Sequence, residues 1–175
     1  IRPNSTQEKL DQLKLAFDTK GTVTAATSSP LTDGAAATII CEENYAKENN
    51  LNILGRIVST AVEGCDPDYM GLGPIGASKK ALMRANLSID KIDIFELNEA
   101  FASQSLACIK DLGIDRKKVN IDGGALALGH PLGATGARIT GKAADLLRRE
   151  NKKYALSTQC IGLGMGIATV IESVD

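Results

Sequence analysis

Gly-His-Pro-Leu-Gly-Ala-Thr-Gly, residues 129–136, holds the only histidine of this 175-residue chain and opens a predicted helix over 133–149, the longest in the sequence. Its glycines let the backbone approach a bound molecule closely. His130 precedes a helix N-terminus, whose positive dipole end favours a neutral imidazole, able to act as a base or a hydrogen-bond donor. An ordinary capped or buried histidine is the alternative. The segment is not a phosphate-binding P-loop, because the Lys-Ser/Thr pair is missing.

Two further residues stand out beside this turn. Cys160 ends a strand-like run and is followed at once by the glycines of residues 162–166. A thiol there is placed for proton transfer, and the Gly162 N–H can meet a developing oxyanion; a small buried hydrophobe is the alternative for a free cysteine. Asn98 follows a predicted strand, where its side chain either caps a helix or holds a water or a substrate carbonyl. Glu99 beside it has an ordinary role as a first-turn complement to the helix dipole.

Strands and helices alternate along most of the chain, which predicts an α/β fold with a mixed sheet covered by helices. The apolar run over 35–42 is ambiguous between helix and strand, and Gly113 is expected to end the helix that starts at Asn98. Helical spacing is expected over 1–17, 45–50, 74–85, 98–112 and 133–149, and strands over 21–24, 57–62, 92–97, 153–158 and 166–174.

The net charge and the lack of long apolar runs argue against some classes of partner and location. The formal net charge is −1, so nothing indicates a nucleic-acid or anionic-membrane partner. No apolar run approaches the roughly 20 residues that span a bilayer, and the chain is expected to be soluble. Arg148, Arg149, Lys152 and Lys153 form a basic cluster, which is expected to be a solvated helix end and alternatively an anion contact.

The four cysteines predict neither a metal site nor a disulfide framework. No C-x-x-C pair exists and one histidine cannot complete a Cys/His zinc site. Reduced, intracellular thiols are the better interpretation. Cys41 and Cys108 lie in apolar runs and are expected to pack in the interior, whereas Cys65 lies in a loop and is expected to be more exposed.

Residues 71–76 match the pattern G-x-G-x-x-G of dinucleotide-binding loops. The context does not fit, because no buried strand precedes the pattern and Pro74 removes a backbone donor where phosphates need one. A helix-entry loop is the better interpretation.

Three motifs together, Asn-Glu-Ala-Phe at 98–101, Gly-Gly-Ala-Leu-Ala-Leu-Gly-His-Pro at 123–131 and Cys-Ile-Gly-Leu-Gly at 160–164, resemble the thiolases in order and separation. Segments 32–37 and 70–74 match two further family segments, so the resemblance covers nearly the whole chain. It implies a thiolase-like fold, with 1–44 as the tail of the loop region and the last elements of the first half, and 45–175 as the C-terminal domain. Segments 1–6, 62–67 and 156–160 look most like the degradative branch, the 3-ketoacyl-CoA thiolases of fatty acid β-oxidation.

The resemblance also implies roles for single residues. His130 corresponds to the histidine that activates the nucleophilic cysteine and helps to bind the thioester oxygen, and Asn98 to the asparagine that positions a water in the same oxyanion hole. Cys160 corresponds to the acid/base cysteine and Gly162 to a backbone donor for the acyl-enzyme oxyanion. Ser29, Met70 and Phe101 fall on positions that line the pantetheine and acyl pocket.

None of the four cysteines has the Cys-x-Ser-like context of the thiolase nucleophile. The chain alone is therefore expected to be inactive unless the missing N-terminal half is supplied. The resemblance implies acyl-CoA and CoA as substrates with no separate cofactor, and a homodimer, a homotetramer or a β-oxidation complex as the assembly. The expected location is the cytoplasm of a bacterium, or a mitochondrion or peroxisome. A biosynthetic acetoacetyl-CoA thiolase and a non-catalytic CoA- or lipid-binding module are the alternatives.

Overall fold

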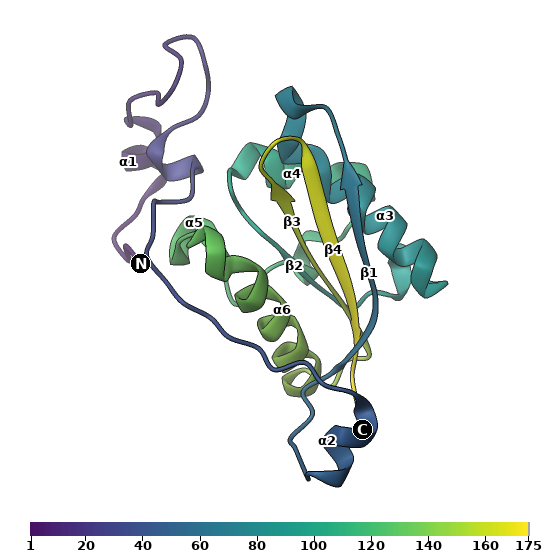
Figure 1. Ribbon diagram of the computed structural model, residues 1–175. Coiled ribbons are helices and arrows are strands. Elements are labelled where there is room, and N and C mark those ends of the chain that lie inside the picture. Colours follow the sequence, from purple (N-terminus) through teal and green to yellow (C-terminus); the bar gives the residue numbers. More distant parts are fainter. Residues whose placement is uncertain (175) are drawn as a thin grey trace.

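A four-stranded mixed sheet forms the centre of the computed structural model, which describes residues 1–174 (Figure 1). The strands are β1 (Arg56–Gly64), β2 (Ile94–Leu97), β3 (Tyr154–Ile161) and β4 (Met165–Glu172), in the order β1-β4-β3-β2. β4 is antiparallel to both β1 and β3, while β2 is parallel to β3. The strands β1, β2 and β3 therefore point the same way.

Helices cover both faces of this sheet (Figure 1). α3 (Gly73–Ala85) packs on β1, β3 and β4, with α4 (Ala102–Leu112) beside it. α6 (Leu132–Arg149) packs on the other face against β2, β3 and β4, and follows the short helix α5 (Ala125–Leu128). The predicted α/β fold with a mixed, helix-covered sheet is confirmed. Short 3-10 helices connect these elements at Ala25–Thr27, Pro67–Leu72 (η2), Ile89–Lys91 and Arg116–Lys118.

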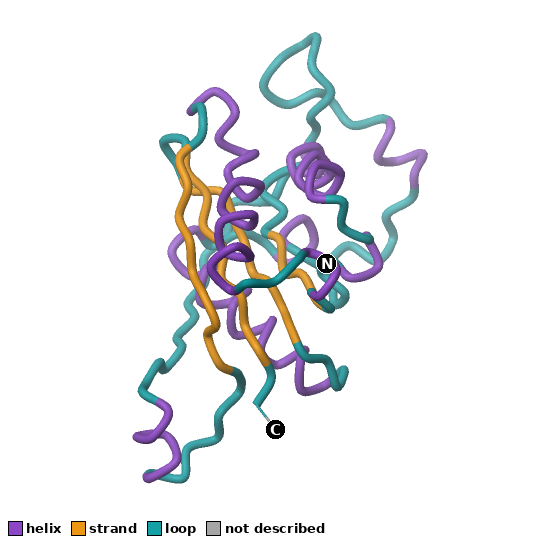
Figure 2. Tube along the Cα trace, turned by 90° about the vertical axis from the view of Figure 1, so that its right-hand side faces the viewer, coloured by secondary structure: helices purple, strands orange, loops and turns teal. Residues whose placement is uncertain are grey.

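Residues 1–55, the strap, lie outside this layered body and include α1 (Gln7–Asp11) and α2 (Glu43–Glu48). The strap runs along α6, where Leu31 pairs with His130 and Thr38 lies beside Gly141. Figure 2 shows α2 and its flanking loops projecting beyond the sheet.

The strap departs most from the predicted elements. The helix expected over 1–17 has only five residues, α1, none of them buried, and the strand expected over 21–24 is a single bridge from Thr24 to Leu15. The run over 35–42 is neither helix nor strand, and Cys41, expected to be interior, is exposed. Ile39 is 91% exposed. Short helices and strands depend on tertiary partners for stability, and little packs against the strap here.

Elsewhere the expected elements differ from the observed ones mainly at their ends, while α5 and the short 3-10 helices were not predicted. α4 begins at Ala102 instead of Asn98, because Phe101 is still extended and pairs with Ser28 of the strap. Gly113 ends α4 in the left-handed conformation, with φ of 66°, as expected. α3 begins at Gly73, with Pro74 in its first turn, directly after η2, which agrees with a helix-entry loop at residues 71–76. No helix among residues 1–174 has both the length and the apolar character needed to cross a membrane.

The close approach of α3 to the sheet depends on two glycines. A Cβ at Gly166 would collide with the backbone of Gly73 and Pro74, and a Cβ at Gly73 would collide with the backbone of Met165 and Gly166. Backbone cannot move aside as a flexible side chain can, so the start of α3 is held against β4 only while both positions lack a side chain.

We therefore expect Gly166→Ala to lower the free energy of unfolding by about 2 kcal/mol or more, the range of overpacking substitutions. Gly133→Ala in α6 is the matched control, because a Cβ there meets nothing within 4 Å; it should be neutral or stabilising by up to about 1 kcal/mol. Urea unfolding followed by circular dichroism measures both. Equal stability of the two variants would contradict the proposed contact.

Candidate active site

The carboxyl ends of β1, β2 and β3 meet at one edge of the sheet, the carboxyl edge, because these strands point the same way. Met70 lies in η2 after β1, Asn98 and Phe101 follow β2, and Gly162 follows β3. Ligands of α/β sheets commonly bind outside the carboxyl ends of the strands. The fold thus places four of the predicted site residues on loops at one edge.

His130 reaches the same edge from the amino end of α6. Its Nε2 lies 3.4 Å from Asn98 Nδ2, and its Nδ1 lies 2.7 Å from Thr135 Oγ1. The Thr135 hydroxyl donates to the Pro131 carbonyl at 3.1 Å, so its oxygen accepts a hydrogen bond from His130 Nδ1–H. This assigns the proton of a neutral imidazole to Nδ1 and leaves the Nε2 lone pair toward Asn98, where it can accept a proton.

Burial lowers the pKa of His130, and the nearby Arg138 guanidinium lowers it further. The imidazole is therefore neutral at pH 7, as expected from the sequence. The cause differs from the expected helix dipole: desolvation acts first and a single cation second. A neutral imidazole with a free Nε2 is the form that acts as a general base.

Asn98 is held in place by the backbone of the neighbouring strand. Its N–H donates to the Thr158 carbonyl at 3.0 Å, and the residue is only 1% exposed. The expected capping role is wrong, because α4 starts four residues later at Ala102. Its Oδ1 is buried and has no partner among the described residues. The carboxamide is therefore not engaged in capping and is held against His130.

Asn120, which the sequence did not single out, holds the segment around Asn98. Its Oδ1 accepts from Leu97 N–H at 2.9 Å, and its Nδ2 donates to the Leu97 carbonyl at 2.8 Å and to Glu99 Oε1 at 2.7 Å. Glu99 Oε2 accepts from Leu126 N–H at 3.1 Å, so Glu99 caps α5, contrary to the expected role in α4. The one sequence signal for Asn120 is its position before Ile-Asp-Gly-Gly, where asparagine tolerates the observed φ of 47°.

The strap closes this side of the site. Ser29 N–H donates to the Ala100 carbonyl at 3.0 Å, and His130 N–H donates to Thr32 Oγ1 at 3.2 Å. Phe101 packs edge-on against Phe17 with ring centroids 6.0 Å apart. Ser29 and Phe101 therefore lie beside one another, on the same strap segment that contacts His130.

Cys160 lies near the end of β3, just before the turn into β4. Its side chain is on the face of the sheet that α3 covers. Leu156 belongs to the core under α3, and alternation along the strand puts Cys160 on that same face. Asn98 shares the α6 face with Ile94. No hydrogen bond joins Cys160 to His130 in the part of the chain described here. The structure thus brings His130 and Asn98 into contact, and places Cys160 at the same edge without direct contact.

The Cys160 thiol is adapted to hold a proton. Burial raises its pKa, and the nearby Cys65 thiol raises it further. A protonated thiol is a poor nucleophile but can give a proton to a carbanion. Gly162 lies two residues further on, and the space around its Cβ position is open to 4 Å. Met70 lies across the hairpin, where its carbonyl faces the Cys65 thiol at 3.9 Å.

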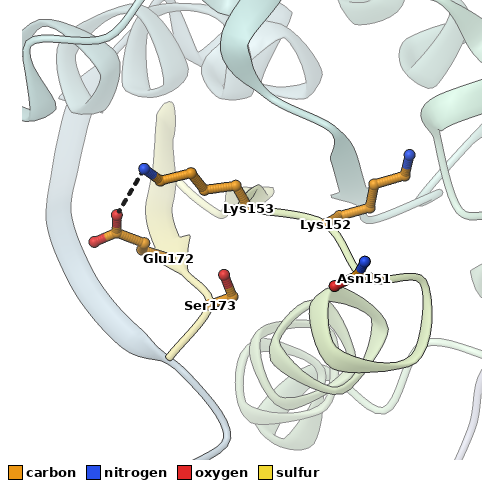
Figure 3. Close-up of a pocket in the computed structure, with 5 residues that line it drawn as sticks. All are labelled: Asn151, Lys152, Lys153, Glu172 and Ser173. Atoms are coloured by element: carbon orange, nitrogen blue, oxygen red, sulfur yellow. Dashed lines mark ion pairs between the residues drawn. The ribbon is translucent and has the colours of Figure 1, made fainter. Parts of the chain in front are cut away.

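A hollow of the surface lies at the opposite edge of the sheet. It encloses about 270 Å³ and is lined by Asn151, Lys152, Lys153, Glu172 and Ser173 (Figure 3). Lys153 pairs with Glu172 across it at 3.8 Å. Arg148 and Arg149 pair with Asp145 and Asp122, so the basic cluster is mostly neutralised, as expected of a solvated helix end. Residues 1–174 contain no group of three or more His, Cys, Asp or Glu side chains placed to hold a metal ion.

Comparison with known proteins identifies the family to which the chain is similar. The family model described as "Thiolase, C-terminal domain" matches residues 51–173, and "Thiolase, N-terminal domain" matches residues 1–44. The 3-ketoacyl-CoA thiolase of Cronobacter sakazakii is 56% identical over 99% of this chain and 46% of that protein, and the one of Salmonella typhimurium is 55% identical over the same shares. The chain therefore spans about half the length of the curated relatives it matches.

Solved structures give the same result. Human mitochondrial 3-ketoacyl-CoA thiolase superposes with a TM-score of 0.92 at 47% identity, over 99% of this chain and 44% of that one. Its complex with CoA superposes at 0.93, and the Bacillus anthracis acetyl-CoA acetyltransferase at 0.96 with 44% identity. The family model matches residues 51–173, and the relatives are more than half identical along the whole chain. This chain therefore belongs to the thiolase family.

Proposed function

We propose that this chain supplies the second half of a 3-ketoacyl-CoA thiolase active centre, which cleaves 3-ketoacyl-CoA with CoA into acetyl-CoA and a shortened acyl-CoA. The observation that carries the proposal is the contact between His130 Nε2 and Asn98 at the carboxyl edge, with Nδ1 fixed by Thr135. A base held next to a carboxamide donor suits a reaction in which a thiol is deprotonated and a carbonyl oxygen becomes negative.

Each residue has a defined task in this proposal. His130 Nε2 takes the proton of a cysteine nucleophile, whose sulfur attacks the 3-keto carbon. As the bond between C2 and C3 breaks, the electron pair stays on the acetyl-CoA enolate, and Cys160 donates the proton that converts it into acetyl-CoA. Cys160, now a thiolate, takes the proton of the CoA thiol as the CoA sulfur attacks the acyl-enzyme thioester. The bond from the acyl carbon to the cysteine sulfur breaks, the cysteine recovers its proton from His130, and the shortened acyl-CoA is released. Asn98 and the Gly162 N–H stabilise the two oxyanions, while Ser29, Met70 and Phe101 line the pocket.

The nucleophile has to come from another polypeptide segment. Cys41 is exposed on the strap and Cys108 is fully buried, with a pKa that burial raises to about 11. Cys160 lies on the α3 face of the sheet with Leu156, the backbone of Cys65 bonds to Gly164 in the adjoining turn, and neither thiol forms a hydrogen bond with His130 among the described residues. We propose that a thiolase N-terminal half provides the nucleophile and covers the exposed apolar strap, in a dimeric, tetrameric or β-oxidation assembly located inside the cell.

Two other functions are each favoured by one observation. The Bacillus anthracis acetyl-CoA acetyltransferase superposes with a TM-score of 0.96, which favours a biosynthetic enzyme acting on acetoacetyl-CoA. The human relative is known in complex with CoA, which favours a module that only binds CoA. The proton-holding Cys160 argues against the binding module, because binding alone needs no acid at that edge.

We expect this chain alone to show no 3-ketoacyl-CoA cleavage, because no cysteine thiolate lies beside His130. Adding a separately produced N-terminal half of a related thiolase should restore release of acetyl-CoA, measured by chromatography. Rates on 3-ketoacyl-CoA of six to sixteen carbons (roughly the range of fatty acyl chains) should exceed the rate on acetoacetyl-CoA. Activity of the chain without the added N-terminal half contradicts the proposal that the nucleophile comes from that half. A preference for acetoacetyl-CoA identifies the biosynthetic alternative.

In the complemented enzyme, Cys160→Ala should lower kcat by about 10²–10⁴-fold, the usual contribution of a general acid, while CoA binding measured by calorimetry persists. Cys65→Ala is the matched control, since it removes a neighbouring loop thiol that is assigned no step. Unchanged turnover in Cys160→Ala excludes the proposed proton donor, and turnover absent in every form, with CoA still bound, favours the binding module.

A further inference from the structure

Two segments of chain meet at the candidate site, and something has to hold them together. Asn98 follows β2 and His130 precedes α6, 32 residues further along the sequence. Their own contact, 3.4 Å between Asn98 Nδ2 and His130 Nε2, is longer than an ordinary hydrogen bond. No backbone hydrogen bond joins residues 98–101 to residues 121–130 in the part of the chain described here. The strap touches both segments from outside, so a direct connection has to come from a side chain.

The Glu99 carboxylate makes this direct connection, because its two oxygens bond to different parts of the segment that leads to His130. Oε1 accepts from Asn120 Nδ2 at 2.7 Å, and Oε2 accepts from Leu126 N–H at 3.1 Å. Both donors are neutral, and Glu99 forms no ion pair within 4 Å among residues 1–174. The carboxylate is therefore committed to this segment and not to a neighbouring cation.

The bond to Leu126 places the start of α5. Gly124, the N-cap of α5, has no side chain to offer, so Glu99 supplies the capping oxygen from another segment. At the other end of α5, Gly129 N–H donates to the Ala125 carbonyl at 2.9 Å, and His130 follows directly. A displacement of the first turn of α5 is therefore passed on to His130.

Gly124 leaves room for the carboxylate. Its φ of −130° and ψ of −163° are those of extended backbone, which any residue adopts. A Cβ at this position would nevertheless collide with Glu99 Cδ and with both carboxylate oxygens. Because the carboxylate is the end of a flexible side chain, an added methyl group would displace it without forcing the backbone to move. Glycine at position 124 is thus explained by the fit of Glu99.

We propose that Glu99 is a positioning residue: its carboxylate holds the loop that carries Asn98 against the start of α5 and so sets the contact between Asn98 and His130. The proposal rests on the proposed function only in taking these two residues as the oxyanion donor and the base of the reaction. Glu99 acts through both of them.

The sole histidine of the chain makes this contact measurable, because its ring gives a single set of nuclear magnetic resonance signals. In the 175-residue chain, a nuclear Overhauser cross-peak should join the His130 ring proton beside Nε2 to the Asn98 carboxamide protons. We expect this cross-peak to be lost in Glu99→Ala. It should be weakened in Glu99→Gln, because an amide oxygen can serve only one of the two donors while its NH₂ group faces the other. Gly124→Ala should weaken it by displacing the carboxylate.

A double-mutant cycle tests the fit between Glu99 and Gly124. Gly124→Ala should lower the urea midpoint of unfolding in the otherwise wild-type chain, because the displaced carboxylate loses its bonds. In the Glu99→Ala background the added methyl group meets no carboxylate, so the same substitution should leave the midpoint unchanged or raise it. An equal lowering in both backgrounds would show that the two positions do not act on one another.

In the complemented enzyme, Glu99→Ala should lower kcat by about 10²-fold, the cost of a misplacement of roughly 1 Å, while CoA binding measured by calorimetry persists. Glu172→Gln is the matched control, because it removes a carboxylate that pairs with Lys153 at the opposite edge of the sheet. This control should change neither the cross-peak nor kcat.

A cross-peak of wild-type intensity in both Glu99→Gln and Gly124→Ala overturns the proposal, as does its absence from the wild-type chain or an additive double-mutant cycle. If Glu99→Ala fails to fold by circular dichroism, the cross-peak in Glu99→Gln and Gly124→Ala decides alone. The cross-peak is measured without substrate, so failure of the thiolase assignment leaves its result intact.

Discussion

The parallel pairing of β2 with β3 is the constraint on which the rest of the site depends. Because these strands end at the same edge, the backbone N–H of Asn98 donates to the Thr158 carbonyl at 3.0 Å, which fixes the position from which the Asn98 side chain extends. β2 has only four residues and is the outermost strand on its side of the sheet, a position where a short strand is easily frayed. Asn120 prevents this by bonding both backbone groups of Leu97, in place of the neighbouring strand that β2 lacks there.

The sequence predicted what local chemistry determines and missed what tertiary contacts determine. The glycine-rich turn before α6, the left-handed Gly113 and the alternation of strands and helices all depend on short stretches of chain, and these predictions agree with the structure. The role of Asn98 as a helix cap was wrong because pairing of Phe101 with Ser28 keeps the backbone extended for four more residues. The hydrogen bonds of Asn120 could not be predicted, because its partners lie 21 to 23 residues away in sequence.

The strap also shows that tertiary contacts cannot be predicted from a local stretch of sequence. Its apolar residues at 35–42 are those of a buried element, yet Ile39 and Ile40 are 91% and 73% exposed. Hydrophobicity predicts that a segment will be covered but does not say by which part of a protein. One part of the strap touches the site directly: residues 28–34 bond to Ala100 and His130 and pack on Pro131. The segment therefore connects the geometry of the site to whatever covers the strap.

The buried polar atoms between the sheet and α6 that have no partner among residues 1–174 lower the stability of the fold, yet they lie beside the candidate site. On the α3 face Leu82, Ile92 and Leu156 pack together, and the Ser78 hydroxyl of α3 is buried without a partner among the described residues. On the α6 face, apolar packing by Ala143, Leu146 and Leu147 stops short of the carboxyl edge, and Glu96, Gln159 and Arg138 take its place. Burying such groups without partners costs stability, and proteins retain departures of this kind mainly at functional sites. Because the apolar cluster of Ala143, Leu146 and Leu147 packs the other end of α6, the helix can tolerate this cost at its amino end, beside His130.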